Sequence, residues 1–271
     1  MAGYCSGRKY FLIFTIDFTF MIKHIPNMIT SLNLLCGAVA ILFAISGDLI
    51  IATVFVFLGI FFDFFDGLAA RLLKVQSPIG VQLDSLADLV TFGLVPSLVM
   101  VQLLQLSFYG EIRPLTEVFS ARAWQVGIDN YYPLLGLIIV VASAYRLAKF
   151  NVDTRQTYHF IGLPTPANAL LILSLPMIFE FQYTETIRDV LFNKWFLIGL
   201  TLVSAILLNA EIHLFAFKFK TGDFKRNKQR YLFLVLCLVL LAWLKFLAIP
   251  IIIASYILIS LIWREELPKE A

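Results

Sequence analysis

The chain has 271 residues, of which 60% are apolar or aromatic and only 14% are charged. A typical soluble domain has roughly 25% charged residues, and a mean hydropathy of +0.87 is too high for a soluble protein of this size. The formal net charge of +3 is too small to indicate a nucleic-acid-binding protein. The composition excludes a water-soluble fold, a disulfide scaffold and a disordered chain, and it predicts an integral membrane protein.

Apolar stretches long enough to cross a bilayer follow one another along the chain. A hydrocarbon core of about 30 Å needs roughly 20 residues of helix. The final stretch, Tyr231–Trp263, is too long for one span and carries Lys245 and Pro250 near its middle, so it is interpreted as two helices. We therefore predict an all-α, polytopic membrane helix bundle with eight spans, or seven as the alternative. The six earlier spans are Ile25–Gly47, Leu49–Phe62, Leu89–Gly110, Tyr131–Tyr145, Phe160–Phe179 and Trp195–Ala210.

The placement of Lys and Arg predicts the orientation, because cytoplasmic loops carry an excess of these residues. If both termini and the even-numbered loops lie on one side, that side holds all but five of the 21 Lys and Arg residues. We therefore expect both termini to be cytoplasmic. Residues 1–24 are interpreted as an interfacial segment; the alternative is a true start at Met21, with Met21–His24 as a short basic leader. The five basic residues outside the cytoplasmic side are Arg113, Arg122, Arg188, Lys194 and Lys245.

Four aspartates lie within or beside the second and third expected spans. A carboxylate at membrane depth is costly unless it is paired or bound. Asp63 and Asp66 are three residues apart and Asp84 and Asp88 four apart, so each pair shares one helix face. Ser77-Pro78 breaks the chain between the pairs. Two antiparallel helices would bring the four carboxylates together near the cytoplasmic surface.

Converging carboxylates repel one another, and a hard divalent cation relieves that repulsion. Ligands that are all oxygen suit magnesium, manganese or calcium. Arg71, one turn beyond Asp66, is suited to a phosphate group, and Gly67 and Gly80 allow close approach of a helix or ligand. This pattern indicates metal-assisted phosphoryl chemistry at the cytoplasmic membrane surface. The alternatives are carboxylates paired with Arg71 and Lys74, and a cation transporter.

The run Asp66-Gly67-x2-Ala70-Arg71-x8-Gly80-x3-Asp84-x3-Asp88, with Asp63 three residues before it, resembles the signature of the CDP-alcohol phosphatidyltransferase family at every fixed position. The resemblance implies a six-helix core at residues 25–217 that transfers a phosphatidyl group from a CDP-linked lipid to an alcohol and releases CMP. It implies two divalent cations (Mg²⁺ or Mn²⁺) and a homodimer. The implied roles are metal ligands for Asp63, Asp66, Asp84 and Asp88, general base for Asp88, and contacts to the cytidine diphosphate for Gly67, Arg71, Ser77 and Gly80.

Three further segments resemble the phosphatidylserine synthase branch of this family: Ile25–Thr30, which continues to Asn33 and Gly37, then Tyr145–Asn151 and Gly162–Ala167. They imply CDP-diacylglycerol and L-serine as substrates. Arg146 and Lys149, at a cytoplasmic helix end, are candidates for binding the serine carboxylate. They would hold a phosphate equally well, so glycerol 3-phosphate remains an alternative acceptor, as does inositol.

Asn27, Thr30 and Asn33 share one face of the first span. Asn27 and Thr30 are candidates for binding the CDP-lipid, and the alternative roles are helix capping and, for Asn33, hydrogen bonding between helices. The basic run 218–230 is expected to fix the topology and contact anionic headgroups rather than nucleic acid. Residues 231–271 are expected to add two helices and a cytoplasmic tail to the core.

Overall fold

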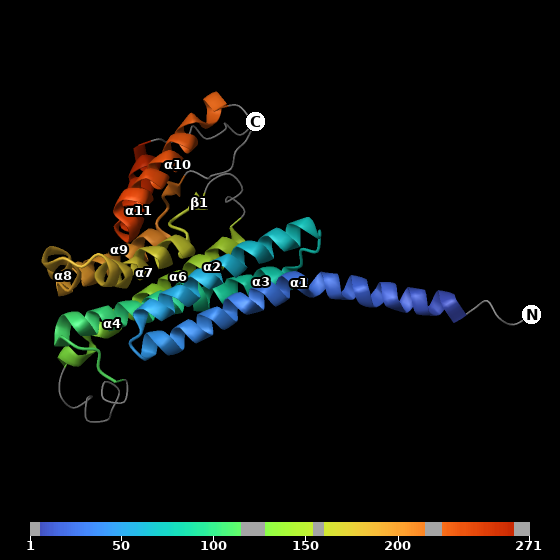
Figure 1. The fold of residues 1–271 in the computed structure, drawn as a ribbon, viewed down its shortest axis with the longest axis horizontal. Helices are drawn as coiled ribbons and strands as arrows, with labels where there is room; N and C mark the ends of the chain where they lie inside the picture. The colour runs from blue at the N-terminus through green and yellow to red at the C-terminus, as the bar shows by residue number, and fades with distance from the viewer. Residues whose placement is uncertain (1–5, 115–127, 154–159, 215–223, 263–271) are drawn as a thin grey trace, which may run out of the picture.

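The computed structural model describes residues 6–114, 128–153, 160–214 and 224–262, and it describes side chains over 22–114, 131–153, 161–214 and 231–262. Nearly all of these residues are helical and form an elongated bundle (Figure 1), which confirms the predicted all-α class. The exception is a short antiparallel pair, β1 (Phe160–Ile161) and β2 (His213–Leu214), in which Phe160 lies opposite Leu214. Of the basic run 218–230, residues 218–223 lie outside the described residues, and residues 224–230 form the first turns of α10 (Phe224–Leu244).

The first two helices form a closely packed hairpin. α1 (Ser6–Ile45) is one helix of 40 residues, about 60 Å long at 1.5 Å per residue. It continues without a break through the expected boundary at residue 24, and its N-terminal part projects beyond the other helices (Figure 1). α2 (Leu49–Leu72) begins at Asp48, whose side chain accepts a hydrogen bond from the Ile51 backbone N–H. Small, fully buried side chains, including Ala44 and Ala52, let the two helices approach.

The third span is the centre of the bundle. It consists of α3 (Pro78–Asp88), a π-helical turn η1 (Leu89–Leu94) and α4 (Val95–Tyr109). In the third span, 72% of the apolar stretch is buried inside the protein, whereas 33% of the apolar stretch of α2 is buried. Pro96 has no N–H to donate, and its ring crowds the carbonyl four residues earlier. The wider π-helical turn, in which the Val95 N–H bonds to the Val90 oxygen, accommodates it.

The remaining elements pack around this central span. The 3₁₀ helix η3 (Ile128–Leu137) leads into α6 (Ile138–Val152), which contacts η1 and α9. α7 (Thr165–Phe181) contacts η1 and α4. α8 (Glu185–Leu191) and α9 (Lys194–Asn209) are bent by 58° relative to each other. Together these elements enclose the apolar core around Phe92, Met100 and Ile172.

The last apolar stretch folds back on itself, as predicted. α10 (Phe224–Leu244) and α11 (Ala248–Ile262) are joined by the 3₁₀ turn η5 (Lys245–Leu247), where Lys245 has φ 49°. The rings of Phe233 and Tyr256 lie 5.9 Å apart. One continuous helix would separate them by about 35 Å, so the two helices form an antiparallel hairpin.

Each of the eight predicted spans has a helical counterpart, although not all are long. Within the described residues, five helical segments are long and apolar enough to cross a membrane, or six if α8 and α9 count as one bent span. The Tyr231–Ile262 hairpin counts as one of these segments, and Thr165–Phe181 is shorter. The outward side chains of these segments are largely apolar, as a lipid environment requires.

Candidate active site

A tight reversal between α2 and α3 brings the two halves of the aspartate motif together. Lys74, with φ 54°, turns the chain after α2. Ser77 then caps α3: its hydroxyl accepts a hydrogen bond from the Gly80 N–H at 3.0 Å. Pro78 occupies the first turn, where a missing N–H costs nothing. The two helices therefore run back alongside each other from this end.

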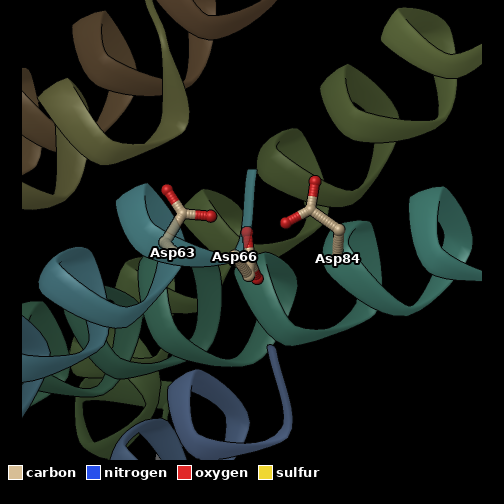
Figure 2. A group of neighbouring side chains, drawn as sticks. All are labelled: Asp63, Asp66 and Asp84. Atoms are coloured by element: carbon tan, nitrogen blue, oxygen red, sulfur yellow. The ribbon is translucent and has the colours of Figure 1, made fainter. Parts of the chain in front are cut away.

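Three carboxylates converge between these helices. Asp63 and Asp66 project from α2 and Asp84 from α3 (Figure 2). Each offers an oxygen atom, and these oxygen atoms all lie within 4.8 Å of one another. Asp66 is only 5% exposed, and its Oδ2 atom is buried without a hydrogen-bond partner. An oxygen-only donor set with an unsatisfied buried oxygen fits a hard divalent cation.

Asp88 lies beside this group, at the end of α3. The Asp63 carboxyl group lies next to both Asp84 and Asp88. The Asn33 side chain of α1 donates from Nδ2 to the Asp88 Oδ1 at 3.4 Å. Asp88 thus adjoins the acidic cluster, and a neutral donor, the Asn33 amide, contacts its carboxylate.

The residues expected to bind the CDP-lipid fall into two groups. Asn27, Ser77 and Gly80 lie together, because a Cβ atom at Gly80 would be 3.1 Å from both the Asn27 Oδ1 and the Ser77 Oγ. Thr30 is buried beside the Asp66 carboxylate, and its hydroxyl donates to the Pro26 carbonyl at 3.0 Å. These contacts bring the middle of α1, around residues 27–30, next to the carboxylate cluster.

Arg71 is exposed at the end of α2 and donates from Nε to the Gly67 carbonyl at 2.9 Å. Among the described residues, no ion pair joins a motif carboxylate to Arg71 or Lys74. The interpretation of the acids as simple partners of these two basic residues therefore lacks support.

The two candidates for the serine carboxylate lie in different surroundings. Arg146 of α6 is 7% exposed, its Nε has no hydrogen-bond partner, and its charge interacts with Asp88. Lys149 lies one turn further along α6 and pairs with Glu211 at 3.4 Å near the surface. Of the two, Arg146 is therefore the residue whose charge interacts with the cluster.

Two contacts around the site are absent from the sequence-based list of site residues. Thr91 of η1 donates to the Asn33 carbonyl at 3.1 Å. Asn151, at the end of α6, donates to the Ser85 hydroxyl of α3 at 2.9 Å. Thr91 follows Asp88 by three residues and so shares its helix face. This spacing could have indicated from the sequence that Thr91 lies near the site. Asn151 ends the Tyr145–Asn151 segment singled out from the sequence, but nothing in the sequence indicated its contact with Ser85.

Comparison with known proteins agrees with this geometry. The model of the CDP-alcohol phosphatidyltransferase family matches residues 23–207, which include every candidate site residue named above. The chain belongs to the CDP-alcohol phosphatidyltransferase family.

Three similar proteins come from two bacteria and one archaeon. The CDP-diacylglycerol–serine O-phosphatidyltransferase of Bacillus subtilis is 37% identical over 155 residues, covering 56% of this chain and 75% of that protein. The Helicobacter pylori protein of the same name is 30% identical over 185 residues, covering 67% and 70%. The archaetidylserine synthase of Methanothermobacter thermautotrophicus is 30% identical over 155 residues, covering 55% and 56%.

Proposed function

We propose that this protein transfers the phosphatidyl group of CDP-diacylglycerol to the hydroxyl group of L-serine, giving phosphatidylserine and CMP. The observation that carries the proposal is the convergence of Asp63, Asp66 and Asp84, with Asp88 and Arg146 beside them. Relatives named for serine transfer support serine as the acceptor. The family alone also allows glycerol 3-phosphate or inositol.

Two divalent cations, Mg²⁺ or Mn²⁺, would be held by Asp63, Asp66 and Asp84, with Asp88 as a further ligand. The buried, unpartnered Oδ2 of Asp66 supports this assignment. When bound, such cations neutralise charge on the diphosphate and stabilise the leaving CMP. The positions of the carboxylates on α2 and α3 would determine where the cations lie.

Asp88 acts as the general base in this proposal. The serine hydroxyl is a poor nucleophile until a carboxylate takes its proton during attack. Its oxygen forms a bond to the lipid-linked phosphorus as the bond from that phosphorus to the CMP oxygen breaks. The proton passes to Asp88 and the bonding electrons leave with CMP.

The chain offers separate contacts for the two substrates. Ser77, Gly80 and Asn27 lie together where α3 begins, and their proximity supports binding of the cytidine diphosphate. Gly67 and Arg71 of α2 and Thr30 of α1 are the further candidates for this substrate. The Arg146 guanidinium is suited to hold the serine carboxylate through two parallel hydrogen bonds. Lys149, paired with Glu211, contributes a weaker positive charge at the rim.

The lipid substrate and the charge distribution suggest where the reaction takes place. The positive-inside distribution favours an active site facing the cytoplasm from the cytoplasmic membrane, with both termini inside. We also propose a homodimer, whose protein mass in detergent solution, after subtraction of the bound detergent, would be twice the chain mass of 30.7 kDa. A mass equal to that of one chain would contradict it.

A single experiment tests the substrate assignment. Purified protein is incubated with CDP-diacylglycerol, Mn²⁺ and a panel of labelled alcohols: L-serine, glycerol 3-phosphate and inositol. We expect phosphatidylserine and an equal amount of CMP. Formation of another phospholipid in preference would overturn the choice of serine. Cation flux in proteoliposomes without CMP release would instead favour a transporter.

A further inference from the structure

A close three-helix contact lies directly behind the carboxylates. Thr91 of η1 is 0% exposed and is enclosed by a glycine on each side. A Cβ atom at Gly37 of α1 would overlap the Thr91 hydroxyl oxygen, and one at Gly59 of α2 would lie 2.6 Å from the Thr91 methyl carbon. The absence of side chains at both glycines is what lets the three helices meet at Thr91.

A chain of hydrogen bonds leads from this contact to Asp88. The Thr91 hydroxyl donates to the Asn33 carbonyl oxygen at 3.1 Å, and the Asn33 Nδ2 donates to the Asp88 Oδ1 at 3.4 Å. Thr91 and Asp88 are three residues apart and share one helix face. Asn33 is 0% exposed, and its Oδ1 is buried without a partner. The side-chain bond to Asp88 is therefore the one that orients the Asn33 amide.

We propose that Asn33 is a positioning residue that holds the Asp88 carboxylate in its catalytic orientation. The Asn33 side-chain N–H holds the Asp88 Oδ1 and leaves the Asp88 Oδ2 free to accept the proton of the attacking hydroxyl. Thr91, enclosed by Gly37 and Gly59, fixes Asn33 in turn. This inference rests on the proposed role of Asp88 as general base.

A neutral donor suits this task for an electrostatic reason. Asp63 and Asp84 repel the Asp88 carboxylate, so without a restraint it would rotate away from them. A Lys or Arg in place of Asn33 would hold it, but a second positive charge in addition to that of Arg146 would make Asp88 a weaker base. An amide restrains the orientation and leaves the charge of the cluster unchanged.

The first test compares two buried side chains that both hydrogen-bond across α1. Asn33→Ala removes the donor to Asp88. The control, Gln102→Ala, removes an equally buried bond from α4 to the Ala44 carbonyl, about 16 Å further along α1. We expect Asn33→Ala to lower kcat about 10- to 100-fold, part of the 10²–10⁴-fold that a general base supplies. KM for CDP-diacylglycerol and the Mn²⁺ affinity measured by electron paramagnetic resonance should stay within about threefold.

Two results of that comparison would overturn the proposal. A loss of kcat no larger than that of Gln102→Ala would make Asn33 an ordinary packing residue. A raised KM for CDP-diacylglycerol with unchanged kcat would make it a substrate-binding residue instead.

Thr91 supplies a second pair of variants that leaves the carboxylate cluster untouched. Thr91→Val keeps the shape and removes the hydroxyl, whereas Thr91→Ser keeps the hydroxyl and removes the methyl group facing Gly59. We expect Thr91→Val to lower kcat several-fold and Thr91→Ser to retain it. Equal effects of the two variants, or a larger effect for Thr91→Ser, would contradict the hydrogen-bonded chain.

A substrate-free measurement separates this inference from the proposed function. Asn33→Ala, Asp88→Ala and the double variant form a thermodynamic cycle in thermal unfolding. Groups in contact give non-additive changes, so we expect the Tm shift of the double variant to differ from the sum of the single shifts. Additive shifts would overturn the contact. If the cycle is coupled but no alcohol is converted, the proposed function fails and the coupling between Asn33 and Asp88 stands.

Discussion

At the scale of single residues, the site is defined by charges that a bilayer does not tolerate in isolation. Three carboxylate oxygens within 4.8 Å of one another destabilise the fold unless a cation offsets them. Their presence together between α2 and α3 is therefore a sign of function rather than of stability. Two consequences can be measured with single substitutions.

Asp66→Asn keeps the size of the side chain and removes its charge, so the cluster loses affinity for a divalent cation. We expect more than about a 100-fold loss of activity, comparable to removing a catalytic group, and complete loss in the parent protein on chelation with EDTA. Asp48→Asn, at the other end of α2, is the control, because Asn caps a helix about as well as Asp. Full activity in the presence of EDTA would show that the carboxylates are structural.

Arg146→Ala tests the serine pocket. Losing one partner of a charge-assisted hydrogen bond costs about 1.5–3 kcal/mol, so we expect KM for serine to rise about 10- to 100-fold while KM for CDP-diacylglycerol changes little. Lys149→Ala should have a smaller effect, because Lys149 already pairs with Glu211. Saturation curves for both substrates decide the matter. A raised KM for CDP-diacylglycerol with an unchanged KM for serine would show that Arg146 binds CDP-diacylglycerol instead.

At the scale of elements, two backbone hydrogen bonds hold the segment before α7 against the end of α9. The Gly162 N–H donates to the Ile212 carbonyl and the Leu163 N–H to the Leu207 carbonyl, each at 2.9 Å. These bonds tie the start of α7 to the end of α9. Because α7 packs against η1, the two bonds also support the turn that follows Asp88.

Gly162→Ala should break these two hydrogen bonds. Gly162 has φ 76°, and a Cβ atom would lie 2.6 Å from the Leu208 carbonyl oxygen. We expect a loss of about 1–3 kcal/mol in the free energy of unfolding, the usual cost of such strain, and a lower Tm. Gly199→Ala in α9 is the matched control: its Cβ atom meets nothing within 4 Å, so it should be neutral or stabilise by up to about 1 kcal/mol. Equal Tm values for the two variants would contradict the role of Gly162.

At the scale of the whole molecule, one central span is enclosed by helices whose outer faces meet lipid. The central segment Pro78–Tyr109 is 72% buried over its apolar stretch, whereas Tyr231–Ile262 is 11% buried. The α10–α11 hairpin therefore lies at the periphery of the bundle (Figure 1). Substitutions in the outer hairpin should perturb the site far less than those in the central span.

Reporter fusions test the orientation of the bundle. The distribution of Lys and Arg predicts that fusions at Lys220, which lies outside the described residues, and at the C-terminus both report a cytoplasmic location. A fusion after Asp189, in α8, is the control and should report the opposite side. A non-cytoplasmic signal from Lys220 or the C-terminus would overturn the predicted topology.

The sequence by itself determined the class, the span pattern and the aspartate motif. Apolar length predicts spans because a bilayer has a fixed thickness, and the pair spacing of the aspartates predicts shared helix faces because the helical period is fixed. The break at Lys245 likewise indicated the α10–α11 hairpin, since a charged residue interrupts an apolar run. These are local properties, and they do not depend on which helices become neighbours.

Only the tertiary structure decided which distant residues meet. The enclosure of Thr91 by Gly37 and Gly59, the contact from Asn33 to Asp88, and the Ser85–Asn151 pair each join segments far apart in the chain. The same holds for Arg146 facing Asp88 while Lys149, one turn away, pairs with Glu211. Helix packing fixes such contacts through side-chain shape and crossing geometry, and neither property is carried by the spacing of residues along a single chain segment.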